Sequence, residues 1–122
     1  MSPINFDILR AKYPEYEAEW KALEEWFGRN WRKRYVELST LLRALSMIDR
    51  FGLVLAIQTM VDEDMLETAY RVKAPGGYLL EDDFPEPDKI PSELPDRDFS
   101  GYIKTADADI VSGYRWEPSD AA

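Results

Sequence analysis

The sequence predicts a mainly α domain that carries a small antiparallel β-hairpin (α+β) and an extended C-terminal arm. Three observations support this class. Apolar residues recur at helical spacing through most of residues 3–65, strand-like alternation replaces that spacing at residues 66–73, and prolines then become frequent. With 122 residues we expect one domain, formed by residues 1–80, with residues 81–122 as a Pro-rich acidic arm and final short strand packed on it.

The first third of the chain shows two helical patterns separated by Pro14. Residues 3–13 predict a short helix with Pro3 in its first turn and Phe6, Leu9 and Tyr13 on one face. A longer helix is predicted from Pro14, ending at Gly28 or Asn30. The apolar stripe of this longer helix consists of Tyr16, Trp20, Leu23 and Phe27.

A brief extended segment and two more helices follow. Tyr35 and Val36 indicate the extended segment, and residues 39–46 predict a compact helix with Ser39 or Thr40 as its cap. Asp49 is suited to cap the next helix, residues 51–65. The buried residues expected in these two helices are Leu41, Leu42 and Leu45, then Leu53, Ala56, Ile57, Met60 and Val61.

The pattern then changes to strands. Residues 66–73 alternate, so that Leu66, Thr68, Tyr70 and Val72 share one side of the predicted strand. Residues 74–77 (APGG) predict a turn and residues 78–81 the returning strand. The arm that follows contains four of the chain's eight prolines, and residues 110–116 predict a last strand. The expected anchors of the arm are Phe84, Ile90, Leu94 and Phe99.

The passage TMVDEDMLETAYRVKAPGGYLL, residues 59–80, resembles the last part of a winged-helix domain. Met60-Val61 and Met65-Leu66 match the two apolar pairs of that pattern, which precede a strand, a wing loop and a second strand. Asp64 stands where the superfamily often has Gly, and Asp adopts left-handed backbone more readily than most residues. The resemblance covers about residues 16–80.

The resemblance implies a role for residues 51–65, because the third helix of DNA-binding winged helices enters the major groove. Asp62 and Glu63 would repel phosphates there, whereas Val54 and Leu55 form an exposed apolar pair that suits a protein partner. We therefore expect a non-enzymatic protein–protein interaction module, acting as a regulator, adaptor or inhibitor. The residues expected to bind the partner are Val54, Leu55 and Gln58, with Trp31 as a further anchor.

Two alternatives involve nucleic acid. A DNA-binding transcriptional regulator would contact phosphates through basic residues, although cations near a helix end are also common solvated surface. The candidates are Arg29, Arg32, Lys33, Arg34, Arg50, Arg71 and Lys73. An acidic mimic of nucleic acid would instead use Asp62–Asp64 and Glu81–Asp83. Residues 51–122 hold 6 Lys/Arg against 16 Asp/Glu, which disfavours DNA as the partner.

Composition removes several other classes. Without Cys or His the chain has no disulfide, no thiolate ligand and no histidine base, so we expect no enzyme. The acidic clusters lack calcium-loop spacing, so we expect neither metal nor cofactor. No apolar run approaches the roughly 20 residues of a membrane helix, and no secretion signal is recognisable. We therefore expect a cytoplasmic protein.

Overall fold

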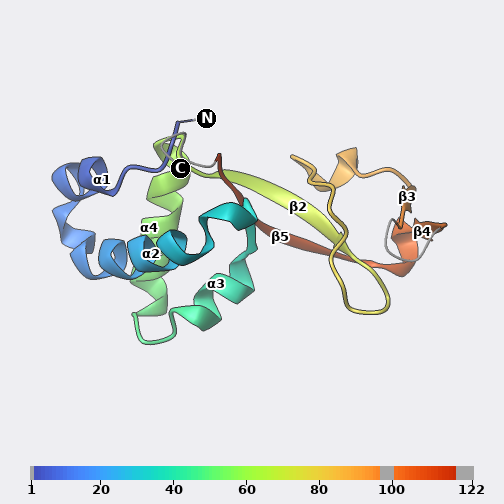
Figure 1. The fold of residues 1–122 in the computed structure, drawn as a ribbon, viewed down its shortest axis with the longest axis horizontal. Helices are drawn as coiled ribbons and strands as arrows, with labels where there is room; N and C mark the ends of the chain where they lie inside the picture. Colours follow the sequence, from blue (N-terminus) through green and yellow to red (C-terminus); the bar gives the residue numbers. More distant parts are fainter. Residues whose placement is uncertain (1, 97–100, 118–122) are drawn as a thin grey trace. The chain divides into compact units, whose positions relative to one another are not determined.

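The computed structural model describes residues 2–96 and 101–117 of the chain. Within these residues the chain forms four α-helices and five short strands, so the predicted α+β class is confirmed (Figure 1). The chain divides into two compact units. The helical unit consists of Met1–Glu67 and Tyr114–Ala122, and the β unit is Thr68–Gly113. The boundary predicted between residues 80 and 81 lies inside the β unit.

The first helix, α1 (Phe6–Lys12), begins at Phe6 rather than near Pro3, because Asn5 supplies the cap. The side-chain oxygen of Asn5 accepts a hydrogen bond from Ile8 N–H at 3.1 Å. This bond satisfies one of the N–H groups that have no partner inside the helix. Phe6 and Leu9 are buried, as the spacing predicts.

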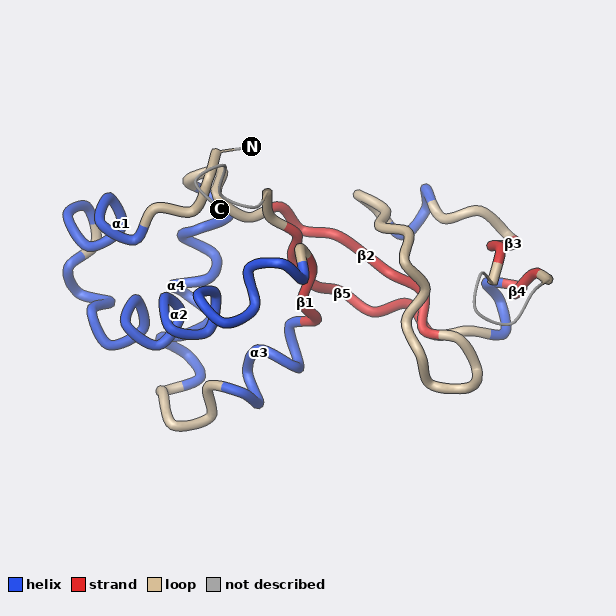
Figure 2. Tube along the Cα trace, viewed as in Figure 1, coloured by secondary structure: helices blue, strands red, loops and turns tan. Residues whose placement is uncertain are grey.

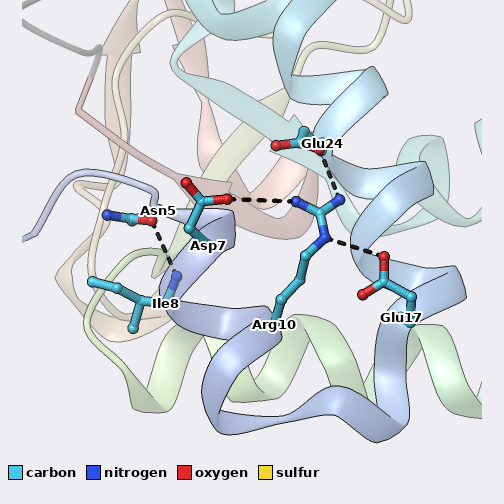
Figure 3. Close-up of polar contacts among 6 residues, drawn as sticks. All are labelled: Asn5, Asp7, Ile8, Arg10, Glu17 and Glu24. Carbon is cyan, nitrogen blue, oxygen red and sulfur yellow. Dashed lines mark hydrogen bonds and ion pairs between the residues drawn. The ribbon is translucent and has the colours of Figure 1, made fainter.

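Arg10 joins α1 to the next helix, α2 (Glu17–Asn30) (Figure 3). Its guanidinium donates to Glu24 Oε1 at 2.8 Å and to Glu17 Oε1 at 3.2 Å, and Asp7 Oδ1 lies 3.9 Å away. The hydrogen bonds to Glu24 and Glu17 raise the pKa of Arg10 above its ordinary value. Since both glutamates belong to α2, this ion-pair network fixes α1 against α2.

The predicted stripe of α2 forms the centre of the helical unit. Trp20, Leu23 and Phe27 are buried, and Tyr16 packs against them from a 3₁₀ turn (Pro14–Tyr16). The Trp20 indole N–H donates to the carbonyl of Tyr13 at 2.9 Å. A second 3₁₀ turn, Trp31–Lys33, follows α2. The stripe prediction is therefore confirmed, because 3.6-residue periodicity alone determines which face of this helix is apolar.

The strand β1 (Tyr35–Glu37) leads directly into α3 (Leu38–Ala44). The prediction that Ser39 or Thr40 caps α3 is wrong. The helix begins before them, its cap position is Glu37, and no side chain accepts a hydrogen bond there. Ser39 instead donates its hydroxyl to the Glu37 carboxylate at 3.4 Å.

The helix α4 (Arg50–Asp62) begins where its cap predicts, since an Asp49 carboxylate oxygen accepts Gly52 N–H at 2.9 Å. After α4 the backbone turns at Asp64, whose φ of 61° is left-handed. That conformation agrees with the tolerance expected of an Asp at this place. The inward set is confirmed: Leu53, Ala56, Ile57 and Met60 are buried and Val61 packs on the core.

The main sheet has the strand order β1-β5-β2, in which β2 spans Glu67–Lys73 and β5 spans Asp109–Arg115 (Figure 2). The predicted turn exists, since Gly77 N–H donates to Ala74 C=O at 2.8 Å with Gly77 at φ 92°. The predicted returning strand, residues 78–81, is confirmed only in part: the segment pairs antiparallel with the end of β2 through an isolated bridge between Lys73 and Leu79 and forms no regular strand. The strand that flanks β2 in the sheet is β5, the last strand among the described residues.

The alternation predicted for β2 assigns residues to its two sides, and burial does not follow those sides. Val72 is buried on one side and Ala69 on the other, whereas Thr68 is exposed. Positions three apart lie on opposite sides of a strand, so β2 has no single inward face. Val72 packs in the core of the β unit, with Leu80 and Leu94.

The predicted arm is shared between the two units: its described residues up to Gly113 belong to the β unit, and those from Tyr114 belong to the helical unit. Tyr70 and Phe84 exchange two backbone hydrogen bonds of 2.8 Å, which extends the pairing along β2. Further on, β3 (Glu93–Pro95) pairs antiparallel with β4 (Tyr102–Lys104). Of the expected anchors, Leu94 is buried, Phe84 and Ile90 are partly buried, and Phe99 lies outside the described residues.

Candidate functional site

The outer side of α4 presents apolar groups to solvent. Phe51 is 73% exposed, Val54 38% and Leu55 39%, and Gln58 is exposed on the same side one turn further on. We call these four residues the α4 face. The prediction that Val54 and Leu55 point outward is confirmed, and Phe51 is an exposed apolar residue that the sequence patterns had not singled out.

Two local hydrogen bonds order the end of the α4 face. Gln58 Nε2 donates to Asp62 Oδ1 at 3.1 Å, and Thr59 Oγ1 donates to Leu55 C=O at 2.8 Å. Residues four apart lie above one another on a helix, so both bonds run along its axis. The amide of Gln58 is therefore held toward Asp62 at the end of the helix rather than left free to rotate.

The acidic residues at the end of α4 are partly neutralised within the helical unit. Glu63 Oε1 accepts hydrogen bonds of 2.9 Å from Lys12 Nζ and from the Tyr13 hydroxyl. These two bonds lower the pKa of the Glu63 carboxyl, and the bond from Lys12 has the larger effect. The bond to Glu63 in turn raises the pKa of Lys12 and that of Tyr13. Glu63 thus links α1 to the end of α4. Within α4 itself, the charged side chains are those of Arg50 and Asp62.

The basic candidates are distributed over both units. Arg29, Arg32, Lys33 and Arg34 are exposed near the end of α2, and Arg50 is exposed at the start of α4. Arg71 and Lys73 belong to the β unit, where Arg71 pairs with the Asp83 carboxylate. The structure therefore brings together the first four cations and does not show all seven as one surface.

Trp31 does not lie on the α4 face. It is half-buried and lines a cavity of about 220 Å³ in the helical unit. The Trp116 indole N–H, just after β5, donates to Trp31 C=O at 3.1 Å. Sequence patterns gave no indication of this pocket, because Trp116 is far from α2 in the chain. The residues that line it are Ile4, Phe6, Glu24, Phe27, Gly28, Trp31, Trp116 and Glu117.

Among residues 2–96 and 101–117, no three acidic side chains gather closely enough to hold a metal ion. None of the helices in the described part of the chain is long and apolar enough to span a bilayer. In comparisons with known proteins, the chain matches no family model, no curated protein and no solved structure.

Proposed function

We propose that this chain is a non-enzymatic, winged-helix-like module that binds another protein through its α4 face. The observation that carries the proposal is the exposure of Phe51, Val54 and Leu55 on one side of a helix whose other side is buried. Exposed apolar residues at spacings of three and four match the anchor pattern by which helices enter apolar grooves. Their clustering distinguishes them from the scattered apolar residues of ordinary surfaces.

The order of the elements supports the winged-helix part of the proposal. The helices α2, α3 and α4, with β1 between the first two, precede β2. If β5 is taken as the returning strand, the segment between β2 and β5 corresponds to the wing in chain order. The left-handed Asp64 between α4 and β2 stands where the superfamily often has Gly.

Electrostatics favours a protein over DNA as the occupant of the α4 face. Contact with phosphates requires several cations, yet Arg50 is the one basic residue among residues 50–62. Asp49 precedes the apolar residues and Asp62 follows them. The complementary partner therefore has an apolar centre with a basic group at the Asp62 end, since Arg50 offsets Asp49 at the other end.

The test uses the full chain as an immobilised bait for proteins from its own cells. Leu55→Asp and Phe51→Asp place a charge in the proposed interface, whereas Ile8→Asp is the matched control, because Ile8 is a 44% exposed apolar residue on α1. We expect one protein to be retained by the wild type and by Ile8→Asp, and lost with both α4 variants. Circular dichroism checks that every variant is folded.

Two results would contradict the proposal in favour of the alternatives. A DNA reader would give a mobility shift at about 50 mM salt that weakens steeply at higher salt. That shift would be lost when Arg29, Arg32, Lys33 and Arg34 become Gln. A nucleic-acid mimic would lose its partner when Asp62, Asp64, Glu81 and Asp82 become Asn or Gln, and would keep it in Leu55→Asp.

A further inference from the structure

The pocket beside Trp31 combines aromatic walls with acidic groups. Its rings come from the start of α1, from α2, from the turn after α2 and from the residue after β5: they are Phe6, Phe27, Trp31 and Trp116. The Phe27 and Trp116 rings meet edge to face, with centroids 4.9 Å apart. This contact fixes the ring planes, so the pocket does not have to be assembled when a ligand arrives.

The polar side chains of the pocket are acceptors. Glu24 and Glu117 supply the two carboxylates, and the lining holds no Lys, Arg or amide side chain. The indole N–H of Trp116 is already used by Trp31 C=O. A ligand that donates hydrogen bonds and carries positive charge therefore fits, because it is attracted both by carboxylates and by the faces of aromatic rings.

Gly28 is the part of the lining that packing does not explain. It lies inside α2 and is not in the left-handed region. A Cβ added there meets no atom within 4 Å. Glycine disfavours helix relative to alanine, so neither the backbone nor a neighbouring group requires it. Its missing side chain leaves the pocket open.

We propose that this pocket receives an arginine side chain of a partner protein. The cavity, about 220 Å³, is smaller than the roughly 300–1,000 Å³ of sites for whole small molecules, so it suits one side chain. A guanidinium stacks on aromatic faces and forms paired hydrogen bonds with a carboxylate.

The two carboxylates attract the arginine of the partner unequally, and a neighbouring cation repels it. Glu24 already accepts a 2.8 Å hydrogen bond from Arg10, so Glu117 is the stronger attractor for an added guanidinium. Arg32 opposes it, because its own guanidinium lies 5.0 Å from the centre of the Trp31 ring. Neutralising Glu117 weakens binding of the arginine, whereas neutralising Arg32 strengthens it.

The experiment is an NMR titration of the full, ¹⁵N-labelled chain. The probe is N-acetyl-arginine methylamide, and its neutral isostere is N-acetyl-citrulline methylamide. We expect saturable shifts of the Trp31 and Trp116 indole N–H signals and of the Gly28 amide, with affinity about 5-fold or more higher for arginine than for citrulline. Glu117→Gln lowers the affinity for arginine, Arg32→Gln raises it, and the control Glu25→Gln on exposed α2 surface leaves it unchanged.

A blocked pocket gives the second arm of the test. Gly28→Leu places a side chain in the open space and abolishes the shifts, whereas Ala18→Leu, which adds the same bulk to an exposed position of α2, retains them. Equal affinity for citrulline, or shifts that survive Gly28→Leu, would overturn the proposal. The pocket and the α4 face share no residue, so Leu55→Asp leaves the titration unchanged whether or not the α4 face binds a protein.

Discussion

The helical unit and the β unit differ in how they are held together. Among the described residues, fourteen buried side chains form the core of the helical unit, whereas the core of the β unit has three. The β unit compensates with polar contacts: the Tyr78 hydroxyl donates to the buried Asp96 carboxylate, and Arg71 pairs with Asp83. Burial of apolar area is the main stabilising contribution to folding, so the helical unit should dominate the free energy of unfolding.

The largest expected effect comes from deleting one buried leucine side chain in each unit and comparing the two losses of stability. Leu23 in α2 is fully buried, and Leu23→Ala should lower the free energy of unfolding by about 4 kcal/mol, because a packed core relaxes only partly around the cavity left behind. All four Trp residues belong to the helical unit, so their fluorescence reports its unfolding in urea. A loss below about 1 kcal/mol would contradict a tightly packed core.

Leu94→Ala makes the same deletion in the β unit. We expect a loss of about 2 kcal/mol, at the low end for such substitutions, because few buried groups surround Leu94. Hydrogen exchange should show the effect at β-unit amides such as Leu80 N–H, which donates to Val72 C=O at 2.9 Å. The tryptophan transition should move less than in Leu23→Ala, and equal movement of the two would mean that the units do not differ as proposed.

Asp49→Ala tests a smaller contribution within the helical unit. The variant removes the acceptor of Gly52 N–H and should lower the free energy of unfolding by about 1 kcal/mol. Asp49→Asn, which keeps an acceptor at the cap, serves as the control and should stay near the wild type. Urea unfolding followed by circular dichroism at 222 nm measures both, and equal losses would show that the charge rather than the hydrogen bond matters.

The smallest effect concerns pH and Glu63. The lowered pKa of Glu63 adds stability that is present above its ordinary value of 4.5 and is lost as pH falls through the lowered pKa. The raised pKa values of Lys12 and Tyr13 add stability that is present below about 10 and is lost at higher pH. Glu63→Gln should therefore flatten both ends of the plot of urea midpoint against pH, and an unchanged acid slope would exclude Glu63 as its source.

The helical unit was largely predictable because its signals are local. The 3.6-residue spacing of Trp20, Leu23 and Phe27 predicts the buried face of α2. Asp49 predicts the start of α4. The same spacing identified Val54 and Leu55 as outward-facing. Local signals did not predict the start of α3 correctly. Because β1 leads directly into α3, there is no loop in which the hydroxyl of Ser39 could act as the cap.

The β unit and the pocket were not predictable in the same way. The neighbour of β2 is β5, and no local pattern links these two stretches. Burial of both Ala69 and Val72 depends on what packs on each side of β2, which alternation alone does not reveal. The pocket needs Trp116 beside Phe27, a contact between residues that only the folded sheet brings together.

β2 and β5 are neighbours in the sheet although residues 74–108 separate them in the chain. The entropy of closing a loop grows slowly, by about 0.6 kcal/mol for each doubling of its length. Loop entropy therefore places little constraint on the length of this segment, and the packing of Leu80 and Leu94 in the core of the β unit constrains it instead. The exposed turn at residues 75–77 is therefore the place to graft a foreign peptide, because an insertion there leaves the pairing of β2 with β5 and the core of the β unit in place.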